Sequence, residues 1–388
     1  MNGYVPFIVA AHVSDIYGPV QALVRYLRAE RKDFVFIEVP FAYAKLDTAR
    51  TTLFRGGEVA EVRRGHANRG DGLLRWWRDY RYVRREGRRF GGPKTRFIGI
   101  NAVNALAGQA LRGQRCCREV TYYVIDYTPR RFASAPLNHV YQTAVKRAAL
   151  GADAVWNLSE RMRQVHARFG VRPGANRLVP VGVDTGAVVR VRESEIDRRR
   201  MVAVSALFES KGIQRVIDAL PDLPGATLAV VGTGPYEPAL RERARARGVA
   251  DRVAFKGLME HDALFAYLPT CGVALATYMP DAGSYTYYAD PTKPKEYLAC
   301  GVPVVITRVP WVAEVIHDRP MGVAVEYDAA SIAQGCRRLL EDDAFWKQCR
   351  DNALAYAGEL DWKVIYNEAF AGTEPERADG AASGRSRG

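Results

Sequence analysis

Short apolar runs alternate with helix-length stretches along the first half of the chain. Each run is about five residues long, rich in β-branched and aromatic residues, and bounded by polar residues, which is typical of a buried strand. The runs cover residues 7–11, 34–39, 97–100, 120–125 and 154–158. The stretches between them predict helices at residues 20–29, 102–112, 137–150 and 160–169. Alternation of strands with helices predicts a parallel, doubly wound sheet.

The same alternation starts again in the second half of the chain. Its apolar runs cover residues 201–205, 227–231, 252–255, 273–276 and 304–306. Residues 186–200 are rich in charge and have little apolar periodicity, so we expect a linker there. The sequence therefore predicts an α/β protein with two Rossmann-like, doubly wound parallel-sheet domains, at residues 1–185 and 201–358. Because such sheets bind ligands outside the carboxyl ends of their strands, we expect the domains to face each other across a cleft.

The composition is that of a globular protein with enough apolar material for two cores. Of the 388 residues, 48% are hydrophobic and 26% are charged. No run approaches the roughly 18–20 apolar residues that span a bilayer, so we expect neither a transmembrane helix nor a signal peptide. The six cysteines form no Cys-x-x-Cys pair, which favours buried thiols in a reducing cytoplasm. Residues 373–388, rich in Gly, Ala, Ser and Arg, are predicted to form a disordered tail.

Residues 63–96 carry twelve Lys or Arg and three acidic residues, and so hold much of the net charge of +13. At helical spacing, one face carries Leu73, Trp76, Trp77, Tyr80 and Val83, and the other carries Arg75, Arg78, Arg81, Arg85 and Arg88. Such a helix over residues 73–89 is typical of segments that bind an anionic membrane surface, here its inner face. Alternatively, the aromatic stripe packs on its own domain. We expect no nucleic-acid binding, because no recognised binding module accompanies the basic segment.

A glycine-rich stretch, Val231-Gly232-Thr233-Gly234-Pro235, lies at the junction of a predicted strand and a predicted helix. Glycines at such a junction let backbone N–H groups approach a phosphate, and a helix N-terminus favours negative charge. A tight turn that needs glycine for its backbone angles explains the same residues. The sequence leaves both interpretations open.

Residues 291–305 predict a helix with an anion at its start. Pro291 and Thr292 fit the first positions of a helix that ends before the strand at 304–306. Lys293 would add positive charge at a positive helix terminus, which is unfavourable unless an anion binds there. A diphosphate would supply that anion, and Glu296, about one turn further on, could accept hydrogen bonds from a ribose diol.

Polar residues of the first half lie where predicted strands end. Asp126 follows the strand at 120–125, which places its carboxylate at the cleft, and it is the candidate general base if the reaction inverts configuration. His12 and Asp15 precede Gly18 and a helix, and are candidates for the cleft and the acceptor side. Carboxylates at such positions are equally often structural, and a lone histidine is more often an ordinary loop residue.

Four motifs, in order, resemble those of the GT-B fold glycosyltransferases, especially bacterial members that build surface polysaccharides. They are Ser210-Lys211-Gly212-Ile213, Val231-Gly232-Thr233-Gly234-Pro235, Val253-Ala254-Phe255-Lys256-Gly257, and the stretch from Lys293 to Val305. The resemblance covers residues 201–370 well and the first half loosely. It implies the GT-B fold and transfer of a sugar from a nucleoside-diphosphate donor, without specifying the sugar.

The resemblance also implies which residues bind the donor. Lys211, Thr292 and Lys293 would bind the diphosphate, and Glu296 would bind the ribose. Independently of the resemblance, breaking the anomeric C–O bond leaves negative charge on the diphosphate, which fixed cations stabilise in the transition state. Lys211 is therefore a candidate catalytic residue as well as a binding residue.

Further roles follow from the same resemblance. The backbone around Gly234 and Pro235 would line the phosphate side of the donor, and residues just after Gly257 would lie near the base. A final helix at residues 359–372 would cross back onto the N-terminal domain, which is expected to bind the acceptor.

Two positions depart from the pattern of many retaining members. Those members have an Arg a few residues before the Lys-Gly pair, where this chain reads Ser205-Ala206-Leu207, so Lys293 would replace the missing cation. They also have a Glu eight positions before the match of Glu296, and this position is Tyr288 here. The contact with the donor sugar and the choice between retention and inversion therefore stay open.

The sequence thus predicts a glycosyltransferase that moves a sugar to a glycan or lipid-linked acceptor, in the biosynthesis of a cell-surface polysaccharide or glycolipid. Because the chain has no Asp-x-Asp motif, we expect no essential metal, and we expect no cofactor besides the nucleotide-sugar substrate. A nucleotide-sugar epimerase on the same fold is the alternative enzyme, and a basic nucleic-acid-binding protein is the alternative without enzymatic activity.

Overall fold

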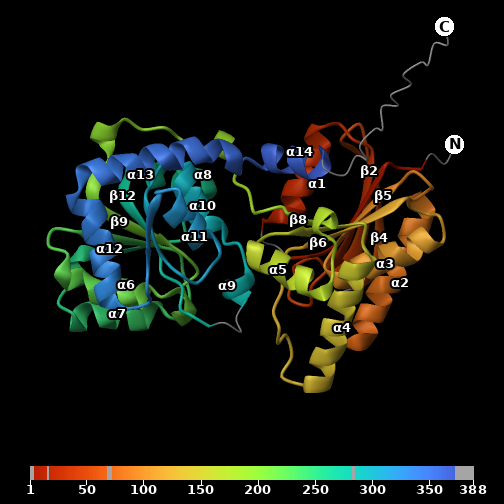
Figure 1. The fold of residues 1–388 in the computed structure, drawn as a ribbon, viewed down its shortest axis with the longest axis horizontal. Coiled ribbons are helices and arrows are strands. Elements are labelled where there is room, and N and C mark those ends of the chain that lie inside the picture. The colour runs from red at the N-terminus through yellow and green to blue at the C-terminus, as the bar shows by residue number, and fades with distance from the viewer. Residues whose placement is uncertain (1–3, 15–16, 68–71, 282–284, 372–388) are drawn as a thin grey trace, which may run out of the picture.

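The computed structural model describes residues 4–14, 17–67, 72–281 and 285–371. The protein forms two lobes, each built on one sheet and covered by helices (Figure 1). Asp15 and the predicted tail at 373–388 lie outside the described residues.

The N-terminal lobe contains an eight-stranded sheet in the order β4-β3-β2-β1-β5-β6-β7-β8. Its strands are β1 (Phe7–Val13), β2 (Phe34–Pro40), β3 (Thr48–Arg55), β4 (Glu58–Ala67), β5 (Arg96–Ile100), β6 (Glu119–Val124), β7 (Ala154–Asn157) and β8 (Asn176–Leu178). Parallel pairing runs along the sheet from β2 through β1, β5, β6 and β7 to β8, as strand–helix alternation requires. The antiparallel strands β3 and β4 extend this sheet at one edge, and the alternation did not predict them.

A tight hairpin joins β3 to β4. Gly56 and Gly57 have φ angles of 54° and 83°, and they connect the paired residues Arg55 and Glu58. Two central residues with positive φ are the geometry that suits the twist of a two-residue hairpin, and glycine adopts it without strain. Most of β4 is exposed because it forms the free edge of the sheet.

Five helices belong to the N-terminal lobe: α1 (Pro19–Ala29), α2 (Leu73–Phe90), α3 (Ala102–Gly113), α4 (Ala135–Gly151) and α5 (Glu160–Phe169). Helices α1, α3, α4 and α5 match the helical stretches predicted from the sequence to within two residues at each end.

The C-terminal lobe contains a six-stranded, wholly parallel sheet in the order β11-β10-β9-β12-β13-β14. Its strands are β9 (Asp197–Val204), β10 (Thr227–Val231), β11 (Val253–Gly257), β12 (Cys271–Ala276), β13 (Val304–Thr307) and β14 (Gly322–Val325). Every residue of β12 and β13 is buried, as expected for central strands covered on both faces. This burial explains why both strands appear in the sequence as continuous apolar runs.

The helices of the C-terminal lobe follow its strands in turn. They are α6 (Ile213–Ala219), α7 (Glu237–Ala246), α8 (His261–Tyr267), α9 (Tyr285–Tyr288), α10 (Thr292–Ala299), α11 (Val312–Asp318), α12 (Ala329–Glu341) and α13 (Asp343–Tyr356).

The last helix, α14 (Trp362–Ala371), leaves the C-terminal lobe and packs against the N-terminal lobe next to α1 (Figure 1). The Tyr366 hydroxyl donates a hydrogen bond to the Pro19 carbonyl over 2.7 Å. The ring of Phe370 stacks on that of Tyr26, with centroids 5.7 Å apart. The helix therefore shares the core of the N-terminal lobe, although it follows the C-terminal lobe in sequence.

Candidate functional site

The loop after β9 holds Lys211 against the loop that follows β12. The backbone N–H of Met279 donates to the Ser210 carbonyl over 3.0 Å. Gly212 has a φ of 74°, and a Cβ at this position would lie 1.5 Å from the Thr277 carbonyl oxygen. Glycine is therefore required here by both the backbone angle and the close approach, and it fixes the lysine at the carboxyl edge of the sheet.

Lys211 is partly buried and carries a charge that no acidic group compensates. Its Nζ lies 5.6 Å from the centre of the Tyr278 ring. Within the described parts of the chain, its side chain has no hydrogen-bonding or ion-pair partner. Burial lowers the pKa of Lys211 from its usual 10.5. A bound anion would offset the cost of holding this cation in the protein.

The glycine-rich loop after β10 packs tightly on the loop after β9. A Cβ at Gly232 would lie 2.0 Å from the Ser205 carbonyl oxygen, and one at Gly234 would lie 2.4 Å from that of Leu207. The Gly232 N–H donates to the Gly257 carbonyl over 2.7 Å, so this N–H is already paired. Close packing alone thus requires both glycines.

The positions on either side of this loop are more open. Pro235 is exposed just before α7, and Gly257 ends β11 with a φ of 68°. Leu258, the next residue, is 77% exposed. An apolar side chain exposed beside this loop fits the expectation that residues after Gly257 lie near the base.

Helix α10 places Lys293 and Glu296 next to Tyr278. The helix begins at Thr292 and Pro291 is its N-cap, whereas the sequence pattern suggested Thr292 as the N-cap. Lys293 Nζ lies 2.7 Å from Glu296 Oε2, so the lysine predicted to need an anion has one within its own helix. Burial, followed by the charge of Glu296, raises the pKa of Tyr278. Tyr278 therefore connects Lys211 with the Lys293–Glu296 pair.

A buried ion pair two residues further along α10 was not predicted from the sequence. Lys295 is paired with Asp290, and both side chains are almost fully buried. The Lys295 ammonium also donates to the Val181 carbonyl over 2.7 Å, and the Val181 N–H donates to Asp290 over 2.7 Å. Burial raises the pKa of Asp290 and lowers the pKa of Lys295. The pair fixes the segment that follows β8 onto α10.

Asp126 lies in the loop after β6, as predicted, and it is engaged by a neighbour. Its Oδ2 accepts a hydrogen bond from Arg131 Nη1 over 2.9 Å. Tyr285 of the C-terminal lobe is 53% exposed, and enclosure by protein atoms followed by the charges of Asp126 and Asp290 raises its pKa to about 12. The charge of Asp126 thus acts on a tyrosine of α9, so Asp126 lies on the side of the N-terminal lobe toward this helix.

Tyr288 lies where the two lobes meet. Its carbonyl accepts a hydrogen bond of 2.5 Å from the Ser159 hydroxyl, and its ring meets the edge of the Tyr127 ring at 5.0 Å. Arg161 Nη1 donates to the Tyr287 carbonyl over 2.9 Å. Helix α9 therefore docks the loop after β12 onto the carboxyl edge of the N-terminal sheet (Figure 1).

His12, at the end of β1, is buried and turned toward α2. Its Nε2 lies 3.4 Å from Asp79 Oδ2, and its Nδ1 lies 3.3 Å from the Asn101 side-chain oxygen. Gly18 precedes α1, and its N–H donates to the Gln21 side chain over 3.0 Å. Because both ring nitrogens of His12 have protein partners, the structure does not place this ring together with Lys211 and Glu296.

Helix α2 does not divide into the aromatic and arginine faces that its spacing predicts. Arg75 is 6% exposed and Trp77 is 58% exposed, so both lie on the side opposite to the prediction. Arg75 donates a hydrogen bond to the Pro40 carbonyl and lies 3.6 Å from Asp79. The prediction was wrong for these two residues, because a buried carboxylate holds an arginine on the face that packs against the sheet. It is confirmed for the buried Val83 and for three exposed arginines, at positions 81, 85 and 88. Nothing is described for the Leu73 side chain.

Two negative findings apply to the described residues. They contain no group of three or more His, Cys, Asp or Glu side chains that could hold a metal ion. Within the same residues, every helix is too short or too polar to cross a bilayer.

Comparison with known proteins finds a family model that matches most of the C-terminal lobe. Residues 198–342 match the family model described as glycosyl transferases group 1. The chain is 31% identical over 224 residues to the GDP-mannose-dependent alpha-(1-6)-phosphatidylinositol monomannoside mannosyltransferase of Mycolicibacterium smegmatis. This match covers 52% of the chain and 57% of the relative, so it spans little more than half of each protein.

Solved structures resemble the whole chain. Crystalline HepE from Anabaena, in complex with UDP, superimposes with a TM-score of 0.72 and 15% identity, covering 94% of this chain and 98% of HepE. Sucrose-phosphate synthase from Thermosynechococcus elongatus gives a TM-score of 0.70 and 18% identity, covering 95% of this chain and 99% of the synthase. At these identities the likeness shows the fold alone.

Proposed function

We propose that the protein is a nucleotide-sugar-dependent glycosyltransferase, because residues 198–342 match the family model of glycosyl transferases group 1 and the whole chain has the GT-B fold. It transfers a sugar from a nucleoside diphosphate to a glycan or lipid-linked acceptor, in the biosynthesis of a cell-surface polysaccharide or glycolipid. The mannosyltransferase relative, whose name includes a phosphatidylinositol acceptor, supports a lipid-linked acceptor and favours transfer over the epimerase alternative.

One observation carries this proposal: the uncompensated charge of Lys211 lies beside Tyr278, and the charge of Glu296, which pairs with Lys293, acts on the same tyrosine. As the anomeric bond breaks, negative charge grows on the diphosphate, and a fixed cation in a partly buried site stabilises it. The donor diphosphate would bind Lys211 and draw Lys293 away from Glu296. Glu296 would then be free to accept hydrogen bonds from the ribose.

Asp126 is our candidate for taking the proton of the acceptor hydroxyl, if the reaction inverts the anomeric configuration. Its position toward the C-terminal lobe supports this role, and Arg131 would have to release its carboxylate first. The anomeric configuration of the product decides the question, because a retained configuration removes the need for such a base.

The enzyme would act in the cytoplasm, peripherally at the inner face of the membrane. The concentration of arginine on β4 and α2 supports this location, because anionic lipid headgroups attract such segments. The free enzyme needs no metal in this proposal, since lysines and backbone groups take up the charge of the diphosphate.

The donor site is tested by thermal unfolding in the presence of UDP, GDP and ADP. A nucleotide present at about 100 times its dissociation constant should stabilise the protein by about 2.7 kcal/mol. We expect Lys293→Ala and Glu296→Ala each to abolish this stabilisation while the unliganded protein still unfolds cooperatively. Lys347→Ala, which removes a lysine from the surface of α13, is the matched control and should keep the full response. An unchanged response in both site variants would refute the assignment.

A further inference from the structure

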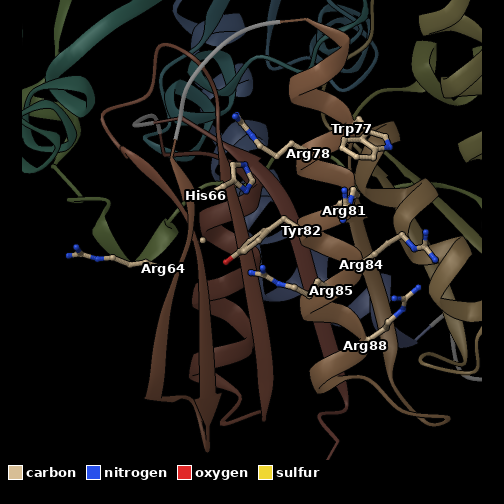
Figure 2. A pocket seen from close by; sticks show the side chains of 10 residues that line it. Arg64, His66, Trp77, Arg78, Arg81, Tyr82, Arg84, Arg85 and Arg88 are labelled. Carbon is tan, nitrogen blue, oxygen red and sulfur yellow. The ribbon is translucent and has the colours of Figure 1, made fainter.

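A basic groove lies between β4 and α2, outside the candidate donor site. Its cavity measures about 610 Å³. Tyr82, Arg78 and Arg85 extend from the helix toward β4, where His66 lies, and Arg81, Arg84 and Arg88 follow the outer side of the helix (Figure 2). Among the residues that the structure describes, six arginines line this cavity and no acidic residue does. A lining so rich in arginine, with this volume, is suited to a ligand that carries phosphate.

The two acidic residues of α2 are buried and already have partners. Asp79 accepts a hydrogen bond from His66 over 2.8 Å, and Glu86, which is 2% exposed, pairs with Arg85 and lies 3.6 Å from Arg63. Because α2 carries seven arginines and only these two acidic residues, its exposed side is positively charged. Positive potential of this kind concentrates anions at the surface.

Aromatic rings hold the guanidinium groups in place. The guanidinium carbon of Arg81 lies 4.5 Å from the centre of the Trp77 ring, and that of Arg85 lies 5.1 Å from the centre of the Tyr82 ring. A guanidinium stacked on a ring keeps its N–H groups directed along the plane, where they can donate to phosphate oxygens. Less conformational freedom is then lost when an anion binds.

The spacing of the arginines matches an extended anion. Arg81, Arg85 and Arg88 are all exposed and follow each other at intervals of four and three residues, so they form a row along the helix, with Arg85 at its edge toward β4. They span about 10 Å along the axis at 1.5 Å per residue. This length suits a diphosphate or neighbouring headgroups better than one phosphate.

An exposed apolar pair at the start of α2 indicates which kind of anion binds. Leu74 is 83% exposed, and Trp77, one turn further along, is 58% exposed and lines the groove. Apolar side chains beside arginines suit a ligand with hydrocarbon next to phosphate. A nucleic acid or a polyanionic glycan offers no hydrocarbon for Leu74 to enter.

Hydrogen bonds link the groove to the edge of the sheet that faces the other lobe. His66 lines the groove, and its partner Asp79 is shared with His12 at the end of β1. A lipid whose phosphate lies in the groove would thus have its headgroup near the carboxyl edge of the N-terminal sheet. Acceptor hydroxyl groups are expected at this edge.

We propose that this groove binds the phosphate or diphosphate of an anionic lipid at the membrane surface, with Leu74 and Trp77 in contact with its hydrocarbon. The inference deepens the proposed function and rests on it, because it assigns a chemical class to the acceptor side. It also replaces the flat interfacial helix with a groove that receives a headgroup.

The test measures sedimentation of the full chain with vesicles, in the absence of nucleotide sugar. Vesicles of phosphatidylcholine alone are compared with vesicles that also contain phosphatidylglycerol. We expect binding to the anionic vesicles only, and a loss of at least tenfold in the triple variant Arg81→Gln, Arg85→Gln, Arg88→Gln. The triple variant Arg168→Gln, Arg172→Gln, Arg245→Gln removes the same charge from other exposed positions and should stay within twofold of the unmodified protein. Trp77→Ala alone should weaken binding severalfold, which covers the case in which the groove triple variant unfolds.

Several outcomes would overturn the inference. Equal losses in both triple variants would mean that the total charge, and not the groove, attracts the vesicle. Tighter binding of a single-stranded oligonucleotide than of anionic vesicles, lost in the groove variant, would assign the groove to nucleic acid. Thermal stabilisation by UDP or GDP is measured on the same variants and should persist in all of them. If it persists while vesicles are not bound, the inference fails and the donor site stands.

Discussion

The candidate donor site and the basic groove each lie beside a buried carboxylate, and the two carboxylates are compensated in different ways. In the C-terminal lobe, Asp290 is paired with the ammonium group of Lys295 on α10. In the N-terminal lobe, Asp79 is shared between two histidines, His12 and His66, which come from different strands.

The difference shows how each site is supported. Lys295 donates a hydrogen bond that holds α10 against the segment after β8. Lys293, on the same helix, remains near the surface, where a ligand can reach it. Asp79 instead holds together residues from β1, β4 and α2, which form the floor beneath the groove. In the C-terminal lobe, one helix therefore carries both a residue that supports the site and a residue that is available to a ligand. In the N-terminal lobe, the support comes from three elements.

The largest effect is expected when the support of the donor site is broken. Lys295→Met leaves the Asp290 carboxylate buried without a counter-charge, and such a loss commonly costs about 3–5 kcal/mol of unfolding free energy. Lys293→Met is the matched control on the same helix, where a partly exposed ion pair contributes less than about 1 kcal/mol. Urea unfolding of the full chain measures both values. Similar values for the two variants would show that Lys295 does not support the lobe.

The next effect concerns the ligand side of the same lobe. Lys211→Ala removes a cation that we expect to face the leaving diphosphate, so kcat should fall about 10²–10³-fold, or about 3–4 kcal/mol. The fold should be unaffected, because this lysine has no hydrogen-bonding or ion-pair partner among the described residues. The measurement is release of nucleoside diphosphate from the donor identified in the thermal assay, compared with Lys347→Ala.

An unchanged rate in Lys211→Ala would remove the main support of the proposed site. A rise in KM with kcat unchanged would instead mean that the lysine binds ground state and transition state equally.

The pattern of the sequence was sufficient for most of the fold in both lobes. The strands β2, β12 and β13 are buried on both faces, so they appear in the sequence as apolar runs, and the hydrophobic pattern identifies them. The edge strand β4 is mostly exposed and carries charge, which hides it from an apolar pattern. The pair Gly56-Gly57 between two β-rich stretches is the sequence signal of this hairpin.

The site was harder to predict because its contacts join distant residues. Lys293 and Lys295 are equivalent in the sequence motif, and only the position of Val181 decides which of them is buried. The same is true of Asp79, whose partners His12 and His66 lie 67 and 13 residues away. Helical spacing therefore predicts an apolar face for α2, whereas charged side chains of this helix are also buried in the folded protein.

The smallest effect, and the one that separates the two carboxylates by pH, is expected for Asp79→Asn. Burial raises the pKa of Asp79, but hydrogen bonds from His12 and His66 and their charges lower it to about 2 overall. A carboxyl group whose pKa is lowered by folding stabilises the protein above its unfolded pKa, and this stabilisation is lost as the pH falls through the folded value. The variant should therefore be less stable by about 2 kcal/mol at pH 6, and the difference should disappear between about pH 4 and pH 2. Urea unfolding across this range, with the exposed Asp47→Asn as control, measures it, and a difference independent of pH would mean that Asp79 acts by packing and not by charge.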